Sequence, residues 1–278
     1  MKNTTQSVGC TAACVLLILG LAGCGAQQPD DDNPVQVTVS TDYEDAVPGH
    51  SITLVWRFKM APNWHLYWIG RNDSGFAPTI DLELPPGWIA GGLHWPAPVR
   101  YLSEGDILDH VYHGELVLLQ KVGVPQGAPT TGTAVVTADV EWLACKTSCV
   151  PGKATISLEI PLTDHHAGPP SELSAQVLDN LPRPLPDGLF DPHWTGQKFH
   201  LTGTGGTQLS FMPTVDCGKL VNLIRDGQGP ELALRFEAEG ETVGPVRGLV
   251  TSKEKDGSIR AYIMDFPAKL LSQESSGG

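Results

Sequence analysis

The chain has 278 residues, of which 41% are hydrophobic and 18% charged, and its formal net charge is −13 with an isoelectric point near 5.0. This is the composition of a folded globular protein that is long enough for one large or two small domains. The acidic balance argues against binding to nucleic acid, whose phosphates would repel it, and against electrostatic adhesion to anionic lipid.

Residues 1–24 have the pattern of an export signal. Lys2 supplies positive charge, residues 11–23 form an apolar run too short to span a bilayer, and small residues lead to Cys24. The pattern resembles a bacterial lipoprotein signal, which implies cleavage before Cys24 and acylation of its thiol; a plain secretory peptide or an uncleaved anchor is the alternative. Acylation would hold the protein to a bacterial membrane, facing the periplasm. Residues 25–34, with three consecutive Asp, are expected to form a flexible, solvated tether.

Alternating apolar and polar residues predict several short strands after this tether. The clearest alternation covers Ile52–Met60. Weaker alternations cover Val35–Val39, Thr79–Leu84 and Glu115–Val124. Residues 62–98 are dense in Pro, Gly and Trp, which predicts long ordered connections. Because turn signals separate the strands and no β-α-β alternation is present, residues 35–163 are expected to form an antiparallel β-sandwich.

Cys145 and Cys149 lie between two further predicted strands, within residues 133–142 and 154–160. A strand-to-strand turn brings two Cα atoms to the separation that a disulfide requires. Closing so short a loop removes little unfolded-state entropy, about 2 kcal/mol, so stability is a weak reason for the bond. An exposed pair beside Lys146, whose charge favours a thiolate, suits thiol–disulfide exchange. A structural hairpin disulfide is the alternative, and a zinc site has less support because a second pair of ligands is missing from this segment.

The count of cysteines also favours a pair at this position. Export and acylation would account for three of the six cysteines, Cys10, Cys14 and Cys24. In an oxidising compartment the remaining three form one bond and leave one thiol. Cys145 and Cys149 are the local pair, and Cys217 is expected to be a buried, inert thiol.

The second half of the chain begins with a predicted helix at residues 171–181, with Ser171 as its N-cap and Pro182 at its end. Residues 164–192 are expected to form this helix and a Pro-rich linker, followed by a second, smaller β-rich domain at 193–272 and a disordered tail at 273–278. The strands of this domain are expected around Phe199 and Leu201, Leu209 and Phe211, Leu232 to Phe236, Val246–Thr251 and Ile259–Ile263. No motif in it carries chemistry, so we interpret it as a spacer or docking surface.

Six short motifs occur in order between about residues 36 and 162. They are Trp64-His65-Leu66-Tyr67-Trp68, Asp73-Ser74-Gly75, Pro85-Pro86-Gly87, Trp95-Pro96-Ala97-Pro98, Tyr112-His113-Gly114, and Trp142-Leu143-Ala144-Cys145-Lys146 with Cys149. Each is weak alone, but in this order and spacing they resemble the periplasmic N-terminal domain of the DsbD/ScsB family of thiol:disulfide interchange proteins. The resemblance implies an immunoglobulin-like β-sandwich that takes electrons from a thioredoxin-like module, fed by a membrane transporter, and passes them to exported proteins. Some relatives are linked to copper tolerance or cytochrome c maturation.

The resemblance also implies roles for individual residues. Cys145 and Cys149 would be the redox pair of a protein-disulfide oxidoreductase, with Cys149 as the nucleophile and Cys145 as the resolving thiol, and with no cofactor or metal. A cap loop over the pair would correspond to Ser103–His110, which lacks an aromatic residue, so tight shielding is not expected. Glu104 and Asp106 in this stretch would raise the thiol pKa if they lay close to it.

Transporter helices and a thioredoxin-like domain are not found in this sequence, so electrons are expected from separate membrane or thioredoxin-like proteins. A lipid anchor would raise the effective concentration of such partners.

Two other functions fit the same residues. The first is a non-catalytic β-sandwich binding module with a structural disulfide. The second is a copper-binding or copper-tolerance lipoprotein in which the cysteines act as soft ligands beside histidines of the first half. These histidines are His50, His65, His94, His110 and His113. A serine hydrolase lacks support because Ser74 has no strand-to-helix elbow, and the Trp and Tyr residues of the first half are expected to pack in the sandwich core.

Overall fold

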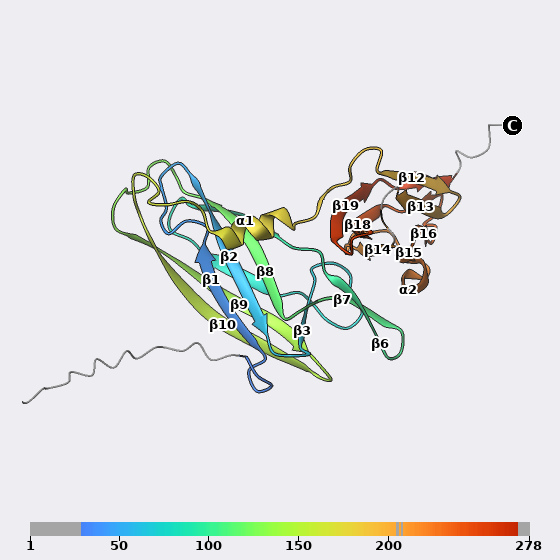
Figure 1. Cartoon of the computed structure of the whole chain (residues 1–278), viewed down its shortest axis with the longest axis horizontal. Helices are drawn as coiled ribbons and strands as arrows, with labels where there is room; N and C mark the ends of the chain where they lie inside the picture. The colour runs from blue at the N-terminus through green and yellow to red at the C-terminus, as the bar shows by residue number, and fades with distance from the viewer. Residues whose placement is uncertain (1–28, 204–205, 207, 272–278) are drawn as a thin grey trace, which may run out of the picture.

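The computed structural model describes residues 29–203, 206 and 208–271, which fold into two β-rich domains joined by a short helix (Figure 1). The predicted signal at 1–24 with Cys24, the start of the tether and the predicted tail at 273–278 lie outside the described residues. Within the described part, no helix is both long and apolar enough to cross a membrane.

The first domain is a sandwich of two antiparallel sheets, which confirms the predicted fold class. The first sheet has the order β1 (Val35–Thr41), β2 (Ser51–Met60), β8 (Glu115–Gly123) and β5 (Ile89–His94). The second has the order β10 (Cys149–Pro161), β9 (Thr133–Cys145), β3 (His65–Tyr67), β7 (Ile107–His113) and β6 (Val99–Ser103), and β4 (Thr79–Glu83) also pairs with β9. The predicted alternations therefore become β1, β2, β4, β8, β9 and β10.

The core lies between the two sheets and contains the inward residues of these alternations. Trp56 and Phe58 of β2, Leu116 and Leu118 of β8 and Val140 of β9 are each fully buried. The tryptophans of the first half pack in the same core, as expected. Such a core fixes the register of the strands that alternate, because a slip of one residue would turn their buried face toward solvent.

Two strands occur where the sequence predicted only connections. β3 has three consecutive buried residues, so it shows no alternation, and β5 contains Gly91 and Gly92 and is mostly exposed. Ser103–His110 was expected to be a cap loop, but it is part of a hairpin. β6 ends at Ser103, β7 begins at Ile107, and a tight turn connects them.

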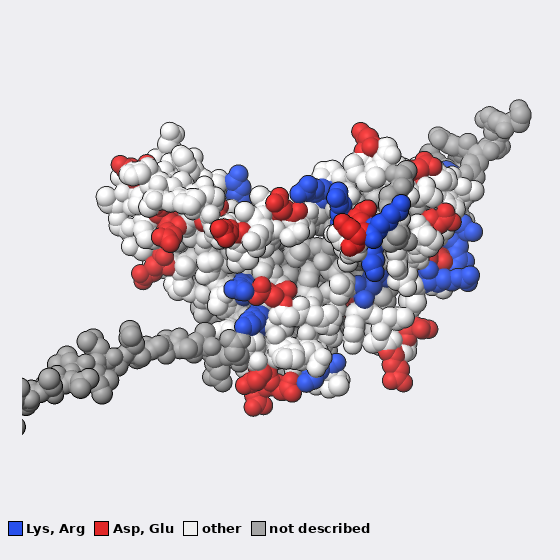
Figure 2. Space-filling view, viewed as in Figure 1, with Lys and Arg blue, Asp and Glu red and all other residues white. Residues whose placement is uncertain are grey.

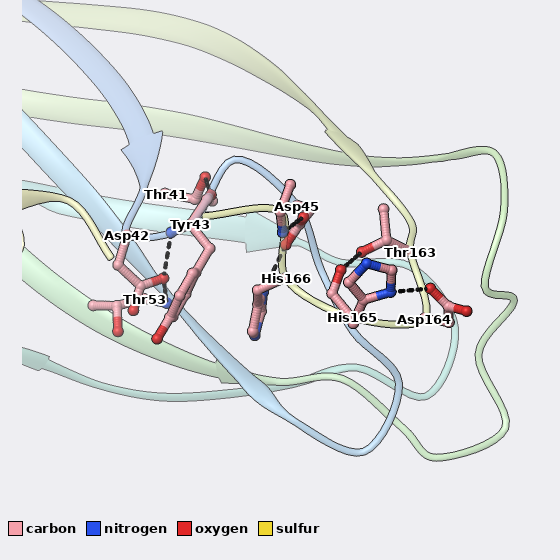
Figure 3. Close-up of polar contacts among 10 residues, drawn as sticks. Thr41, Asp42, Tyr43, Asp45, Thr53, Thr163, Asp164, His165 and His166 are labelled. Carbon is pink, nitrogen blue, oxygen red and sulfur yellow. Dashed lines mark hydrogen bonds and ion pairs between the residues drawn. The ribbon is translucent and has the colours of Figure 1, made fainter. Parts of the chain in front are cut away.

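After β10 the chain returns along the first sheet and is fixed there by Asp45 (Figure 3). The buried Asp45 carboxylate lies 2.6 Å from His166 Nδ1 and accepts a hydrogen bond of 2.8 Å from the Ala167 N–H. The His166 ring also stacks on Tyr43, with 3.9 Å between ring centroids. These contacts hold residues 166 and 167, a few residues before the following helix, against the first domain.

Helix α1 (Glu172–Asp179) lies over β8 and β2 (Figure 1) and covers part of the outer face of the first sheet. Its apolar residues Leu173 and Val177, with Leu181 just beyond, pack against a small cluster of Val55, Val117 and Leu119. Leu178 was expected on this apolar side but is exposed. Ser171 stands at the N-cap position, although its side chain makes no capping hydrogen bond.

The described residues of the second domain form two larger sheets, one small two-stranded sheet and one helical turn. The larger sheet has the order β11 (Arg183–Pro184), β19 (Ile259–Phe266), β18 (Val246–Lys253), β14 (Gln208–Pro213) and β15 (Gln228–Gly229). The other elements are β12 (Phe190–Thr195), β13 (Lys198–Gly203) and β16 (Glu231–Arg235) in one sheet, β17 (Thr242–Val243) with β20 (Lys269–Leu270), and α2 (Leu223–Asp226). Phe199, Leu201, Phe211, Leu232 and Leu234 fill its core, as their alternation predicted.

Charge is distributed unevenly between the two domains. Residues 29–182 contain seven Lys and Arg against nineteen Asp and Glu, whereas residues 183–271 contain ten against eleven. On the face shown in Figure 2, most of the Lys and Arg side chains accordingly lie on the second domain. The net negative charge of the protein is therefore a property of the first domain.

Candidate functional site

Cys145 and Cys149 form a disulfide at the tip of the β9–β10 hairpin. The two residues are partners in the strand register, with their Cα atoms 4.1 Å apart, and a turn closed by the Lys146 N–H to the Ser148 carbonyl connects them. The predicted pair is confirmed, but its exposure is unequal. Cys145 is only 4% exposed, whereas Cys149 is exposed. Cys149 is therefore the solvent-exposed member of the pair.

The buried side of the disulfide is packed against aromatic residues of the second sheet. Cys145 is paired with His65 of β3 and lies in a cluster with Tyr67 and Val111, with Tyr101 of β6 against it. The His65 ring contacts both Tyr67 and Tyr101, with centroids 5.3 and 5.0 Å away. This cluster surrounds Cys145, so Cys149 is the more accessible half of the bond.

Tyr67 links the disulfide to a polar chain. Its hydroxyl lies 3.8 Å from Cys149 Sγ and 3.2 Å from Ser74 Oγ, and Ser74 Oγ donates to Asp109 Oδ2 at 2.6 Å. Since the Ser74 proton is donated to Asp109, the single Tyr67 proton has two acceptors, Ser74 Oγ and Cys149 Sγ. Tyr67 can therefore donate to sulfur when charge develops there.

Asp109 is a buried carboxylate that holds the loop before β4 in place. Besides the Ser74 hydroxyl, its Oδ1 accepts from the backbone N–H groups of Asp73 at 2.9 Å and Ser74 at 3.0 Å. The Asp73 carboxylate in turn accepts from the Leu108 N–H at 2.7 Å. A buried carboxylate is stable only when hydrogen bonds compensate it in this way.

The same loop packs tightly on the Tyr67 ring. A Cβ placed on Gly75 would lie 2.2 Å from ring carbons of Tyr67, so only glycine allows the backbone this close. Loop residues 71–75, together with Asp109, therefore fix the position of the Tyr67 hydroxyl relative to Cys149.

Burial determines the protonation states around the disulfide. Burial, and then the neighbouring His113, lower the pKa of His65, so its ring is neutral at neutral pH and supplies no positive charge to a thiolate. Burial also raises the pKa of Tyr67, so its hydroxyl keeps the proton that it can donate. The cation next to the pair in sequence is Lys146.

Lys146 is held by a residue of the predicted tether. The Asp31 carboxylate accepts from Lys146 Nζ at 2.9 and 3.1 Å and from the Trp64 indole N–H at 2.7 Å. Hydrogen bonds from Trp64 and Lys146 lower the pKa of Asp31. The sequence predicted a solvated segment here, whereas Asp31 contacts the loop that carries the cysteines.

The other residues singled out from the sequence lie elsewhere. Cys217 is a buried free thiol whose pKa is raised by burial, in agreement with the expected inert residue. Glu104 and Asp106 are exposed in the β6–β7 turn. Of the five histidines weighed as copper ligands, only His65 and His113 lie together, with ring centroids 5.6 Å apart. No group of three or more His, Cys, Asp or Glu placed to hold a metal is found among the described residues.

Comparison with known proteins places this site in a family. A family model described as "Thiol:disulfide interchange protein DsbD, N-terminal" matches residues 34–161. Residues 34–161 belong to the DsbD N-terminal domain family. These matched residues include both cysteines, Tyr67, Ser74 and Asp109. The resemblance inferred from the sequence motifs is confirmed.

A solved structure shows the same fold. The N-terminal periplasmic domain of ScsB from Proteus mirabilis superposes with a TM-score of 0.55 at 17% identity, and the match covers 88% of this chain and 97% of that one. The N-terminal domain of DsbD from Neisseria meningitidis, in its reduced form, matches with a TM-score of 0.29 at 15% identity, over 48% of this chain and 87% of that one. No curated protein matches the chain.

Proposed function

We propose that this protein is a thiol–disulfide interchange module that relays electrons between a thioredoxin-like or membrane donor and exported partner proteins through Cys145 and Cys149. The observation that carries the proposal is the Cys145–Cys149 disulfide at the tip of a hairpin, with Cys149 exposed and Cys145 buried. So short a loop contributes little to stability, which favours exchange over stapling.

The proposed reaction begins with a thiolate of the reduced donor. It attacks Cys149 Sγ and forms a mixed disulfide, while the Cys145–Cys149 bond breaks and Cys145 leaves as a thiolate that takes up a proton. The second donor thiolate then attacks the donor sulfur, and Cys149 is released. The donor is oxidised to its disulfide and this domain is reduced to the dithiol, with two electrons transferred.

The second half-reaction follows the same path in the opposite direction. The Cys149 thiolate attacks the disulfide of an exported partner, the partner's first sulfur leaves as a thiolate, and Cys145 then attacks Cys149 to release the second. The Tyr67 hydroxyl, which can turn its proton from Ser74 toward sulfur, supports Cys149 as the cysteine that carries the negative charge.

The surroundings of this reaction are part of the proposal. The DsbD family and the periplasmic origin of the ScsB domain support the periplasm, and the sequence at Cys24 supports a lipoprotein anchored to a bacterial membrane. The acidic first domain favours partners whose docking surface is neutral or basic, and gives no support to nucleic acid as a ligand.

A direct test uses reduced thioredoxin as a defined donor. The Cys145→Ser variant, oxidised with thioredoxin carrying a single cysteine, is expected to form a mixed disulfide through Cys149, because that sulfur is exposed. The matched Cys149→Ser variant is expected to form it much more slowly, since Cys145 is buried. Equal yields from both variants would contradict the assigned roles, and no transfer to the wild-type protein under conditions where dithiothreitol reduces it would contradict the relay.

A further inference from the structure

Two arginines of the first domain extend into the second domain beside the redox site. Arg100 of β6 donates three hydrogen bonds to backbone carbonyls, those of Phe211 at 2.9 Å, Leu223 at 3.0 Å and Ile224 at 3.3 Å. Burial lowers the pKa of Arg100 to about 10, so the guanidinium remains charged at neutral pH. A partly buried guanidinium that donates to three carbonyls is a specific docking contact.

Arg71, in loop 71–75 of the first domain, also contacts the second domain. Its Nη2 donates to the Cys217 carbonyl at 2.6 Å, and its backbone N–H donates to the Pro213 carbonyl at 2.9 Å. Gly70 allows this approach, because a Cβ there would lie 2.7 Å from the Pro213 oxygen. Met212 and Leu249 of the second domain also pack into the core cluster of the first. The two domains therefore share one continuous interface at this loop.

The loop that Arg71 attaches to the second domain is the one that positions Tyr67. From Arg71 the chain continues through Asp73 and Ser74, which are hydrogen-bonded to Asp109, and Ser74 contacts the Tyr67 hydroxyl beside Cys149. Arg100 immediately precedes Tyr101, which lies against the cluster around Cys145. Arg71 is therefore connected to the disulfide through loop residues 71–74 and the Tyr67 hydroxyl, and Arg100 through its neighbour in sequence, Tyr101.

We propose that Arg71 and Arg100 are positioning residues through which the second domain holds the Tyr67 hydroxyl at Cys149. This inference rests on the proposed function of the cysteines and gives the second domain a part in it. With the domains docked, the Tyr67 proton is available to a Cys149 thiolate; when the contact is lost, loop 71–75 moves and the thiolate loses its donor.

The test is the acid dissociation constant of Cys149, measured in the Cys145→Ser background from the pH dependence of alkylation by iodoacetamide, with Cys149 followed by mass spectrometry. Removing the donor with Tyr67→Phe is expected to lower this constant about tenfold, the effect of one hydrogen bond to an ionised group. Arg71→Ala and Arg100→Ala are expected to lower it about threefold, since the donor is loosened rather than removed. The matched control is Arg57→Ala, because Arg57 pairs with Glu115 and not with the second domain.

The double variant Arg71→Ala with Tyr67→Phe separates positioning from a direct effect of charge. If Arg71 acts through Tyr67, its removal adds nothing once the hydroxyl is absent; a direct Coulomb effect would persist undiminished. An unchanged dissociation constant in a folded Arg71→Ala protein, or additive effects in the double variant, would overturn the proposal.

If the Arg71→Ala protein does not fold, the Arg100→Lys variant tests the proposal instead, because one ammonium group cannot replace a guanidinium that donates to three carbonyls. It is expected to lower the constant by the same factor as Arg100→Ala, and a wild-type value would overturn the proposal. A different result would contradict the proposed relay, namely a disulfide too stable to exchange with thioredoxin. Failure of the positioning role can therefore be distinguished from failure of the relay.

Discussion

At the scale of single residues, the charge next to the cysteines is set by a contact between distant parts of the chain. Asp31 holds Lys146, and this pairing reduces the help that the ammonium group gives to a neighbouring thiolate. We predict that Asp31→Asn raises the reduction potential by stabilising the reduced form, shifting the equilibrium with glutathione about threefold, or roughly 15 mV for a two-electron couple.

Asp32→Asn is the matched control for this measurement. The Asp32 carboxylate has no ion pair among the described residues, so its removal is expected to leave the glutathione equilibrium near the wild-type value. Since Asp31 is largely exposed, its effect should also fade in high salt. A shift of equal size in both variants, or one that salt does not change, would refute a specific role for the Asp31–Lys146 pair.

His110 gives the folded protein a defined sensitivity to acid. Its Nδ1–H donates to the Arg71 carbonyl at 2.6 Å, its Nε2 is buried without a partner within the described residues, and burial lowers its pKa to about 4. Because the unfolded chain takes up this proton near pH 6.5 and the folded one does not, stability is complete above pH 6.5 and declines as pH falls toward 4.

We predict that His110 alone accounts for a loss of about 2 kcal/mol in the free energy of unfolding between pH 6.5 and pH 5. Urea unfolding at the two pH values measures it, with His110→Asn as the non-titrating comparison. The variant is expected to be less stable at pH 6.5 but to lose less on acidification. The same pH dependence in both proteins would show that His110 is not the group responsible.

How far single residues could be predicted depended on whether their contacts are local. Cys145 and Cys149 were identified because the turn that joins them is encoded within a few residues. Tyr67 and Asp109 come together only when β3 and β7 pair, and Asp31 meets Lys146 across more than a hundred residues of sequence. Tyr67 lies in the motif Trp64–Trp68, whose spacing alone indicates no role for its hydroxyl.

At the scale of elements, the β9–β10 hairpin that presents the disulfide depends on Gly152. This residue is the register partner of Trp142, and a Cβ on it would lie 2.3 to 2.6 Å from atoms of the indole ring. We predict that Gly152→Ala destabilises the first domain by about 2 kcal/mol, the usual cost of overpacking, as measured by urea unfolding.

Gly127→Ala is the control for this substitution. Gly127 has nothing within 4 Å of an added Cβ and no left-handed backbone, so its substitution should change the free energy of unfolding by less than about 0.5 kcal/mol. If Gly152→Ala were equally silent, the packing of Trp142 on the hairpin would not be the constraint we describe.

Strands were predictable where one face is buried and the other is not. The alternations of β2, β9 and β10 follow this rule, and their positions agree with the sequence. β3 is buried on both faces and only three residues long, while β5 is an edge strand with two glycines, so neither carries the signal. The stretch expected to form a cap loop, Ser103–His110, is the β6–β7 turn with the first residues of β7.

At the scale of the whole molecule, Arg71 and Arg100 connect the second domain to the part of the first domain that carries the cysteine pair. The sequence indicated only a spacer or docking surface for the second domain. Arg71 and Arg100 belong to no motif, and the groups that they contact are backbone carbonyls, which every residue has, so the sequence carries no signal for these contacts. We infer from this arrangement that the two domains function as one unit, with the acidic first domain presenting Cys149 and the second holding the loop beside it.

The central claim is that the Cys145–Cys149 bond is made for exchange, and its reduction potential tests this most directly. We would equilibrate the fragment lacking residues 1–24 in glutathione and dithiothreitol buffers and quantify the trapped thiols. A potential within the range of exchange proteins, about −120 to −270 mV, is the predicted result. A value well below about −300 mV would mark a structural bond and contradict the account.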